Sequence, residues 1–151
     1  MTQTTLPTEL STELFIGGKA VPARDGGRFD VLDPSTGETV ASVADATVED
    51  ALAAVAAAHD AAARWAATAP RERAEILRAA FETMTARADQ LAHLISLENG
   101  KALRDARGEI AYAAEFFRWY SEEAVRNIGA VTESPSGTNQ IMVIRQAVGV
   151  C

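Results

Sequence analysis

The chain has 151 residues, 48% hydrophobic and 23% charged, and this length and composition match one ordinary globular domain. The net charge of −7, with basic residues interleaved among acids, argues against nucleic acid or an anionic membrane as partner, because both attract clustered lysine and arginine. Residues 1–11 lack the basic and apolar regions of a signal peptide, no stretch could span a membrane, and the single cysteine, Cys151, forms no intrachain disulfide. We therefore expect a cytoplasmic protein.

Four short strands are predicted after a mobile tail over residues 1–12. Gly17 and Gly18 have the character of the two-residue loop of a tight hairpin, and a second turn is expected from Pro34 to Gly37. The strands on either side of these two turns are expected at 13–16, 19–21, 29–33 and 39–43.

Three helices are predicted next, from apolar residues that recur at helical spacing. Their expected ranges are 47–67, 70–99 and 101–129. Thr47 and Asp50 have the spacing of a capping box, Pro70 suits the first turn of a helix, and Gly100 can take the left-handed conformation that closes one. At about 1.5 Å per residue the third helix would be roughly 40 Å long, which indicates that it crosses a larger body.

The end of the chain is predicted to be a loop followed by a strand. Residues 133–139 are rich in Ser, Pro, Gly and Thr, which is typical of a loop. Residues 140–150 are rich in Ile and Val, so the chain is expected to end inside a strand. The predicted fold class is therefore α/β, with short β-hairpins, three helices and one final strand.

The sequence contains none of the motifs sought for cofactor or metal binding. Neither Gly-x-Gly-x-x-Gly nor Gly-x-x-x-x-Gly-Lys-Ser/Thr occurs in the chain. His59 and His93 fall on different predicted helices, without the spacing of a metal site. Cys151 lies beside apolar Val148 and Val150, which favours a buried strand residue over a nucleophile. We therefore assign no catalytic, cofactor-binding or metal-ligating residue.

An aromatic group on the third predicted helix is the remaining candidate site. Tyr112 and Phe116 are four residues apart and form one ridge, whereas the whole group of Tyr112, Phe116, Phe117, Trp119 and Tyr120 faces several directions. Packing of the ridge against another part of the protein is favoured over a role as a substrate-channel wall, and both interpretations stay open.

Several stretches, taken in order, resemble the amino-terminal part of the aldehyde dehydrogenase superfamily. They are Leu14–Lys19, Asp33–Glu38, Glu98–Lys101 and Gln146–Val150. Two further stretches, Gly108–Phe116 and Trp119–Ala124, look most like the succinate-semialdehyde dehydrogenase branch, with aminoaldehyde and other semialdehyde enzymes as close rivals. Ala147 departs from the family, which usually has Pro before Val-Gly-Val.

The resemblance implies that this chain is the N-terminal portion of an enzyme that oxidises an aldehyde, succinate semialdehyde in the favoured case, with NAD or NADP. Residues 13–129 would form the first part of the cofactor-binding domain, and 130–151 a loop and the start of a strand leading to the oligomerisation ribbon of a homodimer or homotetramer. The family's Pro-Trp-Asn segment is expected just after Cys151, with the catalytic and cofactor-contacting residues beyond it, so the chain alone is expected to be inactive. Tyr112 and Phe116 are its substrate-tunnel candidates, because the corresponding helix borders the tunnel in this family.

The alternative is a self-sufficient, non-catalytic helical module that binds a partner or assembles, for example by pairing its last strand with that partner. Such a module would unfold cooperatively, whereas a portion of a larger enzyme would expose apolar surface and aggregate or lose fixed packing.

Overall fold

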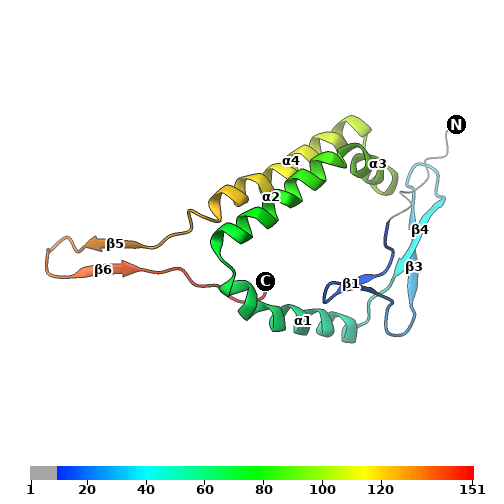
Figure 1. Cartoon of the computed structure of the whole chain (residues 1–151). Coiled ribbons are helices and arrows are strands. Elements are labelled where there is room, and N and C mark those ends of the chain that lie inside the picture. Colours follow the sequence, from blue (N-terminus) through cyan, green and yellow to red (C-terminus); the bar gives the residue numbers. More distant parts are fainter. Residues whose placement is uncertain (1–9) are drawn as a thin grey trace.

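The computed structural model describes residues 10–151, so most of the tail predicted over 1–12 lies outside the described residues. Three antiparallel strand pairs and four helices follow one another along the chain (Figure 1). In order they are β1 Leu14–Ile16, β2 Lys19–Val21, β3 Arg28–Leu32, β4 Thr39–Ala44, α1 Val48–Ala67, α2 Pro70–Ala86, α3 Ala88–Asn99, α4 Leu103–Glu123, β5 Ala130–Glu133 and β6 Gln140–Val143. The predicted α/β class with short hairpins is confirmed.

The first two hairpins form where the turn residues predict them. Gly17 and Gly18 have φ angles of 60° and 80°, and such positive values at both turn positions suit the right-handed twist of paired strands. Strand β1 pairs with β2 in register Leu14 to Val21, and β3 pairs with β4 with a bulge between Val31 and Leu32.

Helix α1 begins with the predicted capping box. The Thr47 hydroxyl accepts the Asp50 backbone N–H at 3.2 Å, and the Asp50 carboxylate accepts the Thr47 backbone N–H at 3.0 Å. The same carboxylate accepts the backbone N–H of Arg24 at 3.1 Å, and Asp50 is only 7% exposed. Asp50 therefore joins the segment after β2 to the start of α1, which no local pattern in the sequence predicts.

These hydrogen bonds predict a pH dependence of stability. Backbone N–H groups of Thr47 and then Arg24 favour the ionised carboxylate, so the pKa of Asp50 lies below its ordinary value of 3.8. A lowered folded-state pKa stabilises the protein above pH 3.8, and this stabilisation is lost as the pH falls through the folded-state value. Urea unfolding should show Asp50→Asn as less stable than the parent at pH 7, and the difference in the free energy of unfolding should shrink as the pH falls below 3.8 towards the folded-state pKa. An equal difference at pH 7 and near the folded-state pKa would contradict this assignment.

The second predicted helix is wrong as one continuous element, because the chain breaks at Arg87 into α2 and α3. Arg87 has φ −104° and ψ 15°, outside the helical range, although its N–H still bonds the carbonyl of Thr83 at 3.1 Å. One turn earlier, the hydroxyls of Thr83 and Thr85 bond the carbonyls of residues 79 and 81, each at 2.8 Å. Such bonds to the preceding turn bend helices, which accounts for a break that apolar periodicity does not reveal.

The third predicted helix is shorter than expected. Its N-terminal boundary at Leu103 lies close to the predicted one, but α4 ends at Glu123 rather than continuing to residue 129. Asn127 and Gly129 are poor helix formers, which argues against a helix that continues to residue 129. At about 1.5 Å per residue, α4 is about 30 Å long.

The C-terminal prediction is also wrong in part. Strand β5, which was not predicted, pairs antiparallel with β6 in register Ala130 to Val143, and the expected strand over 140–150 ends at Val143. All eight residues of this pair are exposed, and residues 144–151 have no regular secondary structure. A strand extends only as far as it has a neighbour, and β5 offers four residues.

The buried interior is made almost entirely of alanine. Helix α4 packs against α2 and α3, and among residues 10–151 the buried apolar side chains are Ala23, Ala44, Ala74, Ala92, Ala106, Ile110 and Ala114. The accessible surface is 11318 Å², whereas a compact monomer of 16.0 kDa exposes about 7,400 Å². The described helices include none that is long and apolar enough to cross a bilayer. The large apolar side chains of this chain mostly point outward.

Candidate functional site

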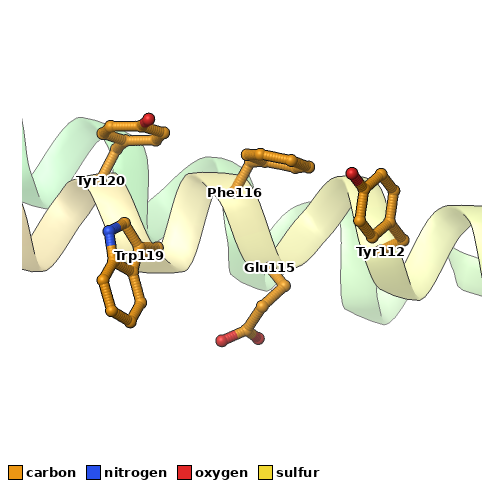
Figure 2. A pocket seen from close by; sticks show the side chains of 5 residues that line it. All are labelled: Tyr112, Glu115, Phe116, Trp119 and Tyr120. Atoms are coloured by element: carbon orange, nitrogen blue, oxygen red, sulfur yellow. The ribbon is translucent and has the colours of Figure 1, made fainter.

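One face of α4 carries a shallow hollow of about 290 Å³, shown in Figure 2. The residues that line it are Tyr112, Glu115, Phe116, Trp119 and Tyr120. Their spacing of three, four, seven and eight residues from Tyr112 places all five on one side of the helix. We call this surface the aromatic face.

Tyr112 and Phe116 form the ridge that the sequence predicts. Their ring centroids lie 4.9 Å apart at an interplanar angle of 88°, which is the edge-to-face arrangement that aromatic quadrupoles favour. The two side chains are 68% and 46% exposed. Each ring restricts the other, so this part of α4 presents a fixed aromatic surface.

The aromatic face points away from the rest of the described chain. The opposite side of α4 carries Ala106, Ile110, Ala114 and Ser121, which are buried against the neighbouring helices. Trp119 is 59% exposed and Tyr120 is 56% exposed, so within residues 10–151 no element covers them. The largest side chains of α4 therefore lie on its unpacked side.

The charges beside the aromatic face are exposed and paired. Arg118 lies 3.7 Å from Glu115 and 3.9 Å from Glu122, and its guanidinium carbon lies 6.0 Å from the ring centroid of Phe81 on α2. Exposed ion pairs contribute about 0 to 1 kcal/mol, so these contacts orient Arg118 more than they stabilise the fold. Among the lining residues, Glu115 is the one charged group.

Sequence reasoning identified the ridge of Tyr112 and Phe116 but did not place Glu115, Trp119 and Tyr120 on the same surface. Glu115, Trp119 and Tyr120 follow Tyr112 at the helical spacings of a single face, and this spacing could have identified them. Phe117, which belonged to the same aromatic group, is off this face and does not line the hollow.

The other candidates give no second site. His59 and His93 are exposed on α1 and α3, and residues 10–151 contain no cluster of His, Cys, Asp or Glu suited to a metal ion. Cys151 is exposed and outside β6, so the expectation of a buried strand residue is wrong. In the described helices, the N-terminal capping residues are Thr47, Ala69, Arg87 and Ala102, with no glycine-rich loop before any of them.

Comparison with known proteins gives consistent matches. The model of the "Aldehyde dehydrogenase family" matches residues 21–151. A succinate-semialdehyde dehydrogenase of Paenarthrobacter nicotinovorans is 54% identical over 112 residues, which cover 74% of this chain and 25% of that protein. The mitochondrial succinate-semialdehyde dehydrogenase of Homo sapiens is 40% identical over 141 residues, which cover 93% of this chain and 26% of that protein.

Solved structures agree with these sequence matches. A succinate-semialdehyde dehydrogenase from Burkholderia pseudomallei superposes with a TM-score of 0.85 and 39% identity, over 91% of this chain and 28% of that one. A betaine aldehyde dehydrogenase from Staphylococcus aureus, solved in complex with NAD+, gives a TM-score of 0.80 and 26% identity, over 83% of this chain and 26% of that one. The chain thus spans about a quarter of the length of the relatives it matches.

Proposed function

Because the chain belongs to the aldehyde dehydrogenase family, we propose that it forms the N-terminal part of an enzyme that oxidises succinate semialdehyde to succinate with NAD or NADP. The observation that carries this proposal is the 54% identity to a bacterial succinate-semialdehyde dehydrogenase. In this proposal residues 13–129 contribute to the cofactor-binding domain. Residues 130–151 contribute to an oligomerisation ribbon, and the enzyme is a cytoplasmic homodimer or homotetramer.

The described residues supply scaffold to this enzyme rather than its reacting groups. Oxidation of an aldehyde through a covalent intermediate needs a nucleophile, a base within hydrogen-bond reach and donors for the developing oxyanion. The exposed thiol of Cys151 donates only to the carbonyl of Gly149, at 3.8 Å, and has no such base beside it. We therefore expect the isolated chain to be inactive, because binding and orientation of the nicotinamide cofactor, which would accept the hydride, depend on other parts of the enzyme.

We place Tyr112 and Phe116 at the wall of the substrate tunnel. Their edge-to-face contact and outward direction give a rigid apolar surface, and ligand sites are lined mainly by such aromatic and apolar groups. A wall of this kind contacts the methylene chain of a small aldehyde. Glu115, beside it, would repel a substrate carboxylate, so the carboxylate end of succinate semialdehyde is recognised elsewhere.

A chimera tests the proposed function. In it, the segment of the P. nicotinovorans enzyme that this chain matches is replaced by this chain. The chimera is expected to reduce NAD+ or NADP+ with succinate semialdehyde, followed at 340 nm, whereas the 151-residue chain alone gives no signal above buffer. An inactive but folded chimera would contradict the proposal, as would turnover by the chain alone.

Substitution in the same chimera tests the tunnel wall. Phe116→Ala is expected to raise KM about threefold to tenfold with little change in kcat, because it removes binding made equally in the ground and transition states. Phe29→Ala is the matched control, since Phe29 is also an exposed aromatic residue, at 52%, but lies on β3. Equal KM values for the two variants would show that Phe116 does not line the tunnel.

A further inference from the structure

The C-terminal end of α3 carries a pair of residues with a chemistry that the proposed function does not use. Asn99 is the last residue of the helix, Gly100 is its left-handed cap, and both are exposed. An asparagine amide that precedes glycine can react with the next peptide nitrogen, because glycine has no side chain to shield that nitrogen. Asn99 is the one asparagine of the chain in this context, since isoleucine follows Asn127 and glutamine follows Asn139.

The reaction is an intramolecular substitution. The backbone nitrogen of Gly100 attacks Cγ of Asn99 and forms a new C–N bond, while the C–N bond of the side-chain amide breaks. The proton of the attacking nitrogen leaves with the departing amine as ammonia. Water then opens the five-membered imide at one of its two carbonyls, which gives aspartate or isoaspartate at position 99. Water is the only co-reactant, so an exposed asparagine has all that the reaction needs.

The folded end of α3 holds the two reacting groups apart. Attack requires the nitrogen to face the amide carbon at about 3 to 3.5 Å, along the direction in which the bond forms. The N–H of Gly100 instead donates to the carbonyl of Ser96 at 2.9 Å, which closes the last turn of α3. This bond keeps the backbone of Asn99 helical, and the imide ring closes only after the turn opens.

Ser96 also holds this turn through its side chain. Its hydroxyl donates to the carbonyl of Lys101 at 2.7 Å, so Ser96 bonds the chain both at and after Gly100. Pro34 packs against the same point, because its Cγ lies 2.9 Å from the position of a Cβ built on Gly100. We call the two hydrogen bonds of Ser96 the α3 cap.

We propose that Asn99 is a site of spontaneous deamidation and that the α3 cap sets its rate. Helix ends open locally at a small fraction of the cost of global unfolding, so the chain reaches the reactive conformation while most of the fold stays intact. The product also weakens the α3 cap. It places a negative charge at the negative end of the α3 dipole, and isoaspartate inserts an extra carbon into the backbone beside Gly100.

Peptide mapping tests the proposal. The 151-residue chain is incubated at mildly alkaline pH, in buffer and in urea, and conversion of each asparagine is followed by mass spectrometry with separation of the aspartate and isoaspartate isomers. We expect both isomers at position 99, with conversion about tenfold or more faster in urea, where the α3 cap is absent. Asn127 and Asn139 are internal controls, because they are exposed and outside helices and strands but precede large side chains. They should convert far more slowly in both solutions.

Ser96→Ala distinguishes the α3 cap from the fold as a whole. Loss of one hydrogen bond shifts the opening equilibrium about twofold to tenfold, so Asn99 should deamidate faster by that factor in buffer. Alanine is a better helix former than serine, so a loss of helix propensity does not explain such an increase. Ser121→Ala is the matched control, because the Ser121 hydroxyl makes a bond of the same length, 2.7 Å, to the carbonyl of Arg118 on α4. It should leave the rate at Asn99 unchanged.

Three results would overturn the proposal. Equal conversion of Asn99 in buffer and in urea would show that the α3 cap gives no protection. Equal rates in Ser96→Ala and Ser121→Ala would show that the hydroxyl of Ser96 does not control the opening. Aspartate without isoaspartate at position 99 would indicate direct hydrolysis of the side-chain amide rather than attack by the nitrogen of Gly100.

Discussion

Replacing Gly100 by alanine is expected to lower the free energy of unfolding by about 2 to 5 kcal/mol, the sum of a conformational and a steric cost. Gly100 closes α3 with φ 74°, a left-handed conformation that side chains with a Cβ disfavour. An added Cβ would also lie 2.9 Å from Cγ of Pro34, which belongs to the β3–β4 turn. A urea titration followed by far-ultraviolet circular dichroism, which reports helix content, measures this loss of stability.

Gly37→Ala separates the two costs. Gly37 has the same φ of 74°, but a Cβ added there has nothing within 4 Å. This variant is therefore expected to lose only the conformational part, about 1 to 2 kcal/mol. If Gly37→Ala and Gly100→Ala lowered the free energy of unfolding by the same amount, the contact with Pro34 would contribute nothing to the cost of Gly100→Ala.

Features with a local cause were predicted correctly from the sequence. The Gly17-Gly18 turn, the capping box of Thr47 and Asp50, and the left-handed Gly100 each depend on residues within one turn of the chain. The contact between Pro34 and Gly100 joins two such features that are far apart in sequence. Both turn and cap were predicted, but nothing local indicates that they meet.

Features that depend on distant or backbone partners were missed. The break at Arg87 follows from hydroxyl bonds of Thr83 and Thr85 to the preceding turn, whereas the apolar stripe continues on both sides of it. Strand β5 exists because β6 pairs with it, and its four residues are too few for a periodic pattern. In both cases hydrophobic spacing was the wrong evidence to use.

Only part of the candidate site was predicted, because the packed side of α4 depends on residues that are distant in sequence. The four-residue spacing of Tyr112 and Phe116 identified their contact, and the structure confirms it. The prediction that the aromatic group faces several directions holds for Phe117 but not for Trp119 and Tyr120, which line the same hollow as Tyr112 and Phe116. Which side of α4 is packed depends on α2 and α3, and residue spacing alone does not give that.

Gly129→Ala is expected to open the β5–β6 pair. A Cβ at Gly129 would overlap the carbonyl oxygen of Val143 and lie 3.2 Å from the carbonyl carbon, and both are backbone atoms of β6. Backbone cannot turn aside as a side chain can, so the strands must separate at the Ala130–Val143 end of their ladder. An isolated two-stranded pair is marginally stable, so this clash exceeds what the pair can absorb.

Hydrogen exchange measures the opening. A destabilisation of about 1.4 kcal/mol changes an equilibrium tenfold, so amides of β5 and β6 in Gly129→Ala should exchange at least tenfold faster, with α2 and α4 unchanged. Gly108→Ala is the matched control, because Gly108 lies within α4 and a Cβ there meets nothing within 4 Å. That substitution should instead stabilise α4 by about 0.5 to 1 kcal/mol. Unchanged exchange of β5 and β6 in Gly129→Ala would mean that the close approach of Gly129 to Val143 does not hold the pair together.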